Sequence, residues 1–207
     1  MPDLSFEREA WRSGHAIVAG IDEAGRGPWA GPVVAGAVIL DADRLGGNLR
    51  RGLDDSKKLK PALRNELFEE LGKHARTGVG TASVTEIDTH NILQATLLAM
   101  KRAIADLGRP APGFALVDGN REPALDCPVR TVVKGDAKSL SIAAASIVAK
   151  VTRDRLMAEL DALYPGYGWA RNAGYGTREH QSALADLGVT PEHRRSFAPI
   201  RKMLSPE

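Results

Sequence analysis

The sequence predicts an α/β protein in which helices cover a mixed β-sheet. Two apolar runs, residues 15–21 and 33–40, are close enough along the chain to pair as antiparallel strands. After residue 60, segments with helical spacing alternate with short apolar runs, which favours strands joined by helices. The chain has 207 residues, of which 43% are hydrophobic and 26% charged, and this is sufficient for one globular core.

The first 60 residues predict two strands and little helix. Residues 1–13 are charged and indicate a frayed end or a short helix. The strand at 15–21 ends in Asp22 and Glu23, and a corner rich in glycine and proline follows at 25–32. Residues 41–60 are polar and contain two adjacent glycines, so a loop is expected there.

The middle of the chain alternates helix and strand. Pro61 suits the first turn of a helix, in which leucines recur every fourth residue at Leu63, Leu67 and Leu71. Residues 77–84 predict the third strand. A long helix is expected over 85–107, with an apolar stripe that we interpret as core: Leu93, Leu97, Met100, Ile104 and Leu107.

Two more strands and three helices complete the prediction. Strands are expected at 113–117 and 129–133, helices at 139–160, 177–187 and 190–203, and a glycine-rich and aromatic loop at 165–176. Thr190 and Pro191 are typical residues for a helix start. We therefore expect a core over residues 1–160, with 1–13 as an extension, and a C-terminal helical segment over 161–207.

Composition excludes several classes of protein. Lys and Arg total 28 against 26 for Asp and Glu, so the net charge of +2 excludes a polybasic tail protein but permits a local basic face. The single cysteine, Cys127, excludes an intramolecular disulfide, and the five histidines lack the spacing of a zinc site. The apolar stretch at 32–40 is too short to cross a membrane, and we expect a cytoplasmic protein.

Acidic residues stand at or just beyond the ends of three predicted strands. They are Asp22 and Glu23, Asp118, and Asp136. Carboxylates at neighbouring strand ends can converge, and a hard divalent cation such as Mg²⁺ or Mn²⁺ would relieve their repulsion. Two such ions would bracket a phosphodiester. The alternative is that these are ordinary turn acids, and spacing alone favours this alternative by about two to one.

Several segments resemble one family closely. Residues 20–28, reading GIDEAGRGP, resemble the opening signature of ribonuclease HII, as does LDDSKKL at 53–59. Lys134-Gly-Asp136 followed by SIAAASIVAKVTRD resembles the long-helix signature of the family, and GYGT at 174–177 with HRRSF at 193–197 matches its C-terminal blocks. The resemblance runs in register from about residue 15 to residue 204.

The resemblance implies a ribonuclease H-like fold, which is a five-stranded mixed sheet flanked by helices with a C-terminal helical cap. It places Asp22, Glu23, Asp118 and Asp136 at the metal-binding acid positions, with Mn²⁺ or Mg²⁺ as cofactors. The implied reaction cleaves the RNA strand of RNA–DNA hybrids and cuts 5′ of single ribonucleotides embedded in duplex DNA. The products carry 3′-hydroxyl and 5′-phosphate ends.

Eight further residues are candidates for binding the substrate. Gly25 and Gly27 allow close approach of the backbone to a 2′-hydroxyl, and Arg26 is expected to contact a phosphate. Composition alone favours an ordinary tight turn. Tyr175 matches the tyrosine that packs on the sugar in this family. Phosphate contacts are expected from loop residues near the acids, namely Ser56, Lys57, Lys138 and Ser139. Ala173 replaces a lysine common in the family, and Arg171 is a candidate to supply that charge.

Three alternatives stay open at this point. The sister class ribonuclease HIII usually carries a large N-terminal domain, whereas 21 residues precede Asp22 here. A nuclease of another two-metal class is disfavoured by the dense motif match, and a non-catalytic nucleic-acid binder by the presence of all four acids. The tail at 202–207 lacks the paired aromatic residues of a sliding-clamp motif, and we expect a monomer.

Overall fold

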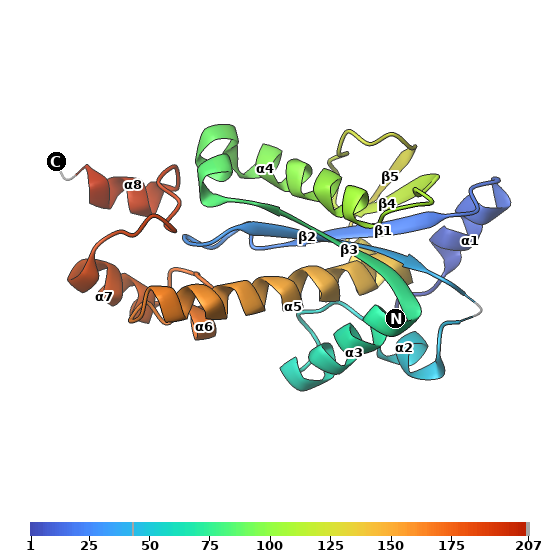
Figure 1. The fold of residues 1–207 in the computed structure, drawn as a ribbon, viewed down its shortest axis with the longest axis horizontal. Helices are drawn as coiled ribbons and strands as arrows, with labels where there is room; N and C mark the ends of the chain where they lie inside the picture. Colours follow the sequence, from blue (N-terminus) through green and yellow to red (C-terminus); the bar gives the residue numbers. More distant parts are fainter. Residues whose placement is uncertain (43, 206–207) are drawn as a thin grey trace.

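Five strands form one mixed sheet in the computed structural model, which describes residues 1–42 and 44–205. The order across the sheet is β3-β2-β1-β4-β5 (Figure 1). Strands β1, β2 and β3 pair antiparallel, whereas β1 with β4 and β4 with β5 pair parallel. The strand bounds are β1 Val18–Ala24, β2 Val33–Leu40, β3 Ala75–Ala82, β4 Phe114–Asp118 and β5 Val129–Val132. The predicted mixed five-stranded sheet is confirmed.

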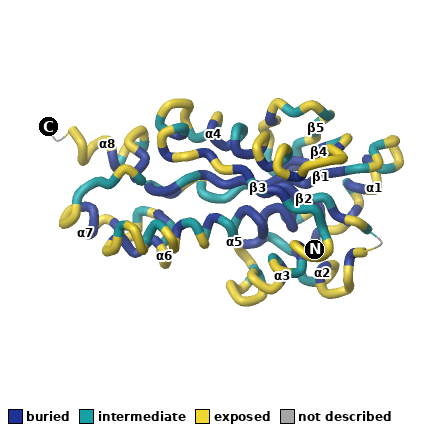
Figure 2. The backbone as a smooth tube through the Cα atoms, viewed as in Figure 1, coloured by how far each residue is buried: buried dark blue, intermediate teal, exposed yellow. Residues whose placement is uncertain are grey.

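Helices cover both faces of the sheet. Helix α4 (Val84–Asp106) lies on one face and the long helix α5 (Leu140–Leu163) on the other, where α2 (Gly47–Gly52) and α3 (Pro61–His74) flank it (Figure 1). The remaining helices are α1 (Ser5–Arg12), η1 (Gly135–Ala137, a 3-10 turn), α6 (Trp169–Asn172), α7 (Arg178–Leu187) and α8 (Ala198–Leu204). Buried backbone is concentrated in the central strands and the first half of α5 (Figure 2).

Small residues allow α5 to lie almost against the sheet. A Cβ placed on Gly20 of β1 would lie 2.2 Å from the backbone carbon of Ser141, closer than any side chain permits. The run Ala143, Ala144, Ala145 on the helix is fully buried against the same layer. Close approach of this kind fixes the height of the helix above β1, and therefore also the position of the strand end that carries Asp22.

The N-terminal segment is part of the folded core. Glu7 and Ala10 of helix α1 are buried, as is Leu4 just before it, and Asp3 forms a parallel bridge with Ser139 before α5. The Glu7 carboxylate accepts hydrogen bonds from the hydroxyls of Ser139 and Ser141, both at 2.6 Å, and from the Ser141 amide at 2.9 Å. Of the two expectations for residues 1–13, the short helix is confirmed.

Local differences from the predicted elements have physical causes. The stretch predicted as loop contains α2, which buries Leu49 against α3 and α5. Leu63 is 40% exposed, so only Leu67 and Leu71 of the leucine stripe are core. In α4, Ala95, Ala99 and Ala103 are fully buried because the helix lies close to the sheet. Of the apolar stripe predicted as core, Met100 and Leu107 are buried in it, and Leu97 and Ile104 pack against it.

The predicted helix at 190–203 is wrong in its first half. Residues 190–197 form turns, His193 forms an antiparallel bridge with Ala30, and α8 begins only at Ala198. The hydroxyl of Thr190 meets the imidazole of His193 instead of capping a helix. A pairing partner more than 160 residues away therefore overrides the local helix-start pattern.

Two sequence predictions concern the whole chain. In the part of the chain that the structure describes, no helix is both long and apolar enough to cross a membrane; the cytoplasmic location stays a prediction. The division at residue 160 also stays a prediction, and α5 continues through that position to Leu163. Pro206 and Glu207, the end of the tail considered for a clamp motif, lie outside the described residues.

Candidate active site

The four acids come from neighbouring strand ends. Asp22 and Glu23 lie near the end of β1, and Asp118 is the last residue of β4. The two strands pair in parallel up to Ile21 and Val117, the residues just before Asp22 and Asp118. Asp136 lies in η1, just after β5. The amide of Gly135 donates a 2.6 Å hydrogen bond to Asp118 Oδ1, which holds the η1 turn against the end of β4.

Burial and repulsion between neighbouring carboxylates disfavour the charged forms of Asp22, Glu23 and Asp136. The pKa of Asp22 is raised well above its usual value because the carboxyl is buried and lies near Glu23, Asp118 and Asp136. Burial also raises the pKa of Glu23, although Arg26 opposes the shift. The pKa of Asp136 is raised by burial and by Asp118. Four acids gathered together, of which Asp22 is buried and the other three partly buried, have the chemistry of a cation site.

The donor set fits a hard divalent cation, because carboxylate oxygens are the ligands that Mg²⁺ and Mn²⁺ prefer. Among the described residues, however, no three acidic, histidine or cysteine side chains already form a closed metal shell. Three of the four acids have another partner in this structure: Asp22 accepts from the Glu23 amide, Glu23 pairs with Arg26 at 3.3 Å, and Asp118 accepts from the Gly135 amide. The acids that a cation site needs therefore lie close together, but their side chains are not arranged as a complete set of metal ligands.

A pocket of about 540 Å³ joins the β1 acids to the glycine corner. We call it the acid pocket, and its lining consists of Asp22, Glu23, Ala24, Gly25, Arg26, Gly27, Ser56, Lys57, Lys150, Arg153 and Tyr175. It therefore unites eight of the sequence-predicted site residues, drawn from three separate segments of the chain. Asp118 and Asp136 are not part of its lining. Both are close enough to Asp22 to raise the pKa of that carboxyl.

Tyr175 lies on the glycine corner with half of its surface exposed. The side chain is 49% exposed, and a Cβ on Gly27 would lie 3.3 Å from its ring. The segment before it is tied to the same corner, because the Trp29 amide donates to the Gly174 carbonyl at 2.8 Å. An aromatic ring held beside bare backbone offers a flat apolar surface to a sugar.

The predicted phosphate contacts divide into three cases. Lys57 lines the acid pocket, and so does Ser56, although Ser56 is buried. Lys138 is exposed, does not line the pocket, and donates to the Val133 carbonyl. Ser139 corrects the expectation: its side chain is fully buried, caps α5 through the Ile142 amide and donates to Glu7, so it has no free face for a phosphate.

Sequence reasoning missed three basic residues at this site. Lys150 and Arg153 line the acid pocket from α5, and Arg194 lies beneath the glycine corner. The sequence did offer a sign of Lys150 and Arg153, because basic residues are unusual in a helix that is otherwise apolar and buried. Arg171, the candidate to replace the family lysine, forms an ion pair with Glu179 on the surface.

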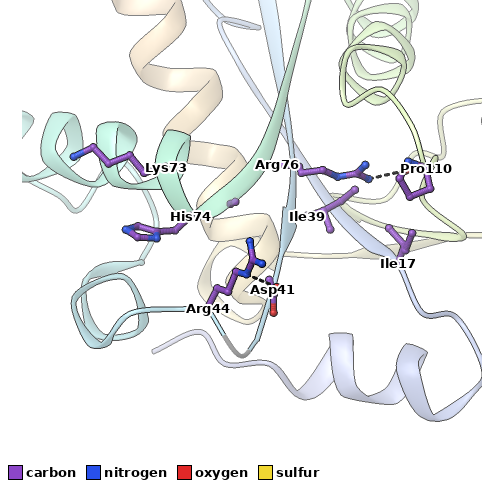
Figure 3. Close-up of a pocket in the computed structure, with 9 residues that line it drawn as sticks. Ile17, Ile39, Asp41, Arg44, Lys73, His74, Arg76 and Pro110 are labelled. Carbon is purple, nitrogen blue, oxygen red and sulfur yellow. Dashed lines mark hydrogen bonds and ion pairs between the residues drawn. The ribbon is translucent and has the colours of Figure 1, made fainter.

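A second hollow, of about 470 Å³, lies where β1 begins, at the opposite end of the sheet (Figure 3). Its cations are already engaged: Arg76 donates to the Pro110 carbonyl at 2.7 Å and Arg44 pairs with Asp41 at 3.5 Å. The side chains of Lys73 and His74 point away from it (Figure 3). This hollow lacks a set of acids, so the candidate chemistry lies in the acid pocket.

Comparisons with known proteins agree with this arrangement. The family model for ribonuclease HII matches residues 19–200. The ribonuclease HII of Paramagnetospirillum magneticum is 60% identical over 204 residues, covering 99% of each chain. The crystal structure of ribonuclease H2 from Pyrococcus horikoshii is 30% identical, covers 90% of this chain and 96% of that one, and superposes with a TM-score of 0.72.

A more distant structure shares the fold alone. Bst-RNase HIII in complex with Mn²⁺ is 19% identical and covers 91% of this chain and 69% of its own, with a TM-score of 0.74. The alternative nuclease classes and the sister class left open by the sequence are therefore set aside by the family match over most of the chain. The chain belongs to the ribonuclease HII family and is a ribonuclease H, an endonucleolytic hydrolase.

Proposed function

We propose that this ribonuclease H cleaves the RNA strand of RNA–DNA hybrids and also cuts on the 5′ side of a single ribonucleotide embedded in duplex DNA. The products would carry 3′-hydroxyl and 5′-phosphate ends. Membership of the family supports activity on hybrids. The observation that supports recognition of a single ribonucleotide is the acid pocket itself, in which Asp22 lies beside Gly25, Gly27 and Tyr175.

The proposed cofactors are two Mg²⁺ or Mn²⁺ ions held by the four acids. Asp22 would bind both ions, Glu23 and Asp118 one of them, and Asp136 mainly the other. The raised pKa of Asp22 supports this assignment, because a nearby cation would favour its charged form. When bound, such ions activate water and stabilise the leaving oxygen of a phosphodiester. The Mn²⁺ complex of a relative with this fold is consistent with the choice of metals.

The protein groups around the acids would bind and orient the substrate. Arg26 is half-exposed and pairs with Glu23, so a phosphate that attracts Arg26 would also release Glu23 for a cation. Lys57 and Lys150 would add positive charge along the backbone of the substrate strand. The glycine corner would read the 2′-hydroxyl through its backbone, and Tyr175 would pack against the sugar.

A cleavage assay tests the proposal. The substrates are an end-labelled DNA duplex with one ribonucleotide, an all-DNA duplex of the same sequence, and an RNA–DNA hybrid, each with Mg²⁺, Mn²⁺ or EDTA. We expect metal-dependent cleavage of the hybrid and a single cut 5′ of the lone ribonucleotide, with the all-DNA duplex intact. Cleavage of the hybrid alone would refute single-ribonucleotide recognition, and cleavage in EDTA would refute the metal assignment.

The proposal includes action as a monomer on duplex substrates in the cytoplasm. Mass determination in solution, with and without an uncleaved duplex, tests the oligomeric state. A mass of one chain per duplex is expected, and two chains per duplex would contradict it.

A further inference from the structure

Two arginines are buried beneath the glycine corner. The exposed fraction is 1% for Arg153 and 0% for Arg194. Within residues 1–42 and 44–205, neither arginine forms an ion pair with a carboxylate, and each guanidinium lies near the other. Burial lowers the pKa of Arg194 to about 9 and that of Arg153 to about 10. Two unpaired buried cations are costly, so the fold needs a compensating set of dipoles.

Backbone carbonyls supply that compensation, and most of them belong to the glycine corner. Arg194 donates to the carbonyls of Gly25 at 2.6 Å, Arg26 at 3.1 Å and Gly31 at 2.9 Å. A fourth bond, of 3.2 Å, reaches the carbonyl of Pro32. A planar guanidinium with five donors can hold several carbonyls in one fixed arrangement, which an ammonium group cannot do.

The carbonyl contacts determine where the amides point. A trans peptide is planar, and its carbonyl and its N–H point in opposite directions. Because the carbonyls of Gly25 and Arg26 are turned inward to Arg194, the amides of Arg26 and Gly27 are turned outward. Both residues line the acid pocket, and neither amide donates a hydrogen bond to any acceptor within the described residues. The corner therefore presents two free donors on its pocket side.

Arg153 joins this corner to the segment before Tyr175. It donates to the carbonyls of Pro32 at 3.0 Å and Ala30 at 3.2 Å, and also to that of Ala173 at 2.9 Å. Gly25 lies directly on this guanidinium: a Cβ there would be 1.9 Å from Arg153 Nε, and the residue has a φ of +96°. One side chain thus holds together the two segments that line the sugar side of the acid pocket.

We propose that Arg194 and Arg153 are positioning residues, which orient the Arg26 and Gly27 amides toward a ribose 2′-hydroxyl and hold Tyr175 beside them. The inference rests on the proposed function and deepens it, because it assigns ribose selection to two buried side chains that act through the backbone they hold. Selection of the ribonucleotide then depends on the guanidinium fork, whereas attraction of the phosphate backbone does not.

Lysine substitutions separate these two effects. Arg194→Lys and Arg153→Lys keep a positive charge but lose the fork, and Arg195→Lys, at the exposed neighbouring position, is the matched control. For each variant we would measure kcat and KM on the single-ribonucleotide duplex, and the inhibition constant of the all-DNA duplex as a competitor. Circular dichroism and thermal unfolding would establish that each variant is folded.

We expect kcat/KM of both lysine variants on the single-ribonucleotide duplex to fall by about 10- to 100-fold, as small misplacements of recognition groups do. The inhibition constant of the all-DNA duplex stays within about twofold, because phosphate contacts are unchanged. A folded variant with the parent value of kcat/KM would overturn the proposal. A parallel loss of ribonucleotide cleavage and all-DNA binding would also overturn it, since that is the result of general disruption.

Amide exchange in the unaltered protein provides a test that does not depend on the variants folding. The Arg26 and Gly27 amides should exchange rapidly in the free protein and become protected with a ribonucleotide-containing duplex, but not with the all-DNA duplex. Amides already protected in the free protein would refute the outward orientation. A parent protein that cuts hybrids but not the single-ribonucleotide duplex would instead refute the proposed function, and the positioning role with it.

Discussion

The Gly135 amide donates a 2.6 Å hydrogen bond to Asp118 Oδ1, and this contact joins the end of β4 to the turn that carries Asp136. Two of the four acids are therefore coupled through a backbone amide. An asparagine at position 118 retains an acceptor for Gly135 but removes the negative charge, so the structure offers a way to separate the charge of Asp118 from its role in the fold.

Asp118→Asn should abolish cleavage while leaving the protein folded. A bound cation contributes several kcal/mol of charge stabilisation, and each 1.4 kcal/mol is worth tenfold in rate, so we expect a loss of about 1,000-fold or more. Initial rates on an RNA–DNA hybrid measure the effect. Asp186→Asn, at an exposed position on α7, is the control. A folded Asp118→Asn protein with the parent rate would remove Asp118 from the metal site.

Asp22→Asn should stabilise the metal-free protein, because it removes a buried charge that Glu23, Asp118 and Asp136 repel. We expect a gain on the order of 1 kcal/mol in the free energy of unfolding in EDTA. Added Mn²⁺ should raise the unfolding temperature of the parent protein but not that of the variant. Equal shifts in both proteins would show that Mn²⁺ binds elsewhere.

Tyr175 should matter most when the substrate offers a single ribose. Tyr175→Ala removes the ring that lies beside Gly27, and we expect roughly tenfold or greater loss of cutting at a single embedded ribonucleotide. Tyr175→Phe retains the ring and tests the hydroxyl separately. Tyr164→Phe, on a tyrosine outside the acid pocket, is the comparison. Unchanged rates in both Tyr175 variants would leave this residue a purely structural role.

The buried pair His180 and His193 should make the fold sensitive to mild acid. Their ring nitrogens are 3.0 Å apart, and burial, with His180 adding to it, lowers the pKa of His193 from 6.5 to about 4. Between about pH 6.5 and pH 4, His193 binds a proton in the unfolded chain but not in the folded chain. The free energy of unfolding therefore falls as the pH drops through this range.

The loss should be on the order of 2–3 kcal/mol. Urea unfolding at several pH values measures it. The His193→Gln variant should show a weaker pH dependence over this range, and the exposed His90→Gln should behave as the parent does. An identical pH profile for His193→Gln and the parent would contradict the assignment.

Glu7 should be important for the stability of the fold because it accepts hydrogen bonds at the start of α5. Its Oε1 accepts three hydrogen bonds at the start of α5, and Glu7→Ala leaves those donors without a partner. We expect a loss of about 2–4 kcal/mol in the free energy of unfolding. Glu9→Ala, two residues away and on the exposed side of α1, should change stability by under about 1 kcal/mol.

The strands, the main helices and the gathering of most candidate residues were predictable from the sequence. Pro61 begins α3 as its local pattern indicates, α7 begins one residue after the predicted start at Thr177, and β2 has the predicted bounds. These features depend on neighbouring residues. The resemblance to a family, rather than strand spacing, identified the four acids, because acids at strand ends are also common in turns.

Long-range contacts were not predictable from local patterns. The burial of Glu7 depends on serines more than 130 residues away, and the turn at Thr190 depends on pairing between His193 and Ala30. Ser139 stands beside a candidate metal ligand, which favoured a phosphate contact, whereas its hydroxyl serves the helix start. Charge and hydrogen-bonding capacity are visible in a sequence, but the partner that uses them is set by tertiary packing.

The bonds from Arg194 to the glycine corner have a consequence for the synthesis of the protein. Gly25 leaves the ribosome long before Arg194, which is 169 residues further along the chain. The corner lacks its guanidinium fork until almost the whole chain has been translated. All four acids, by contrast, have been translated once residue 136 has been added. Under the positioning role that we propose for Arg194, the ribose-selecting part of the site is therefore completed later than the metal-binding part.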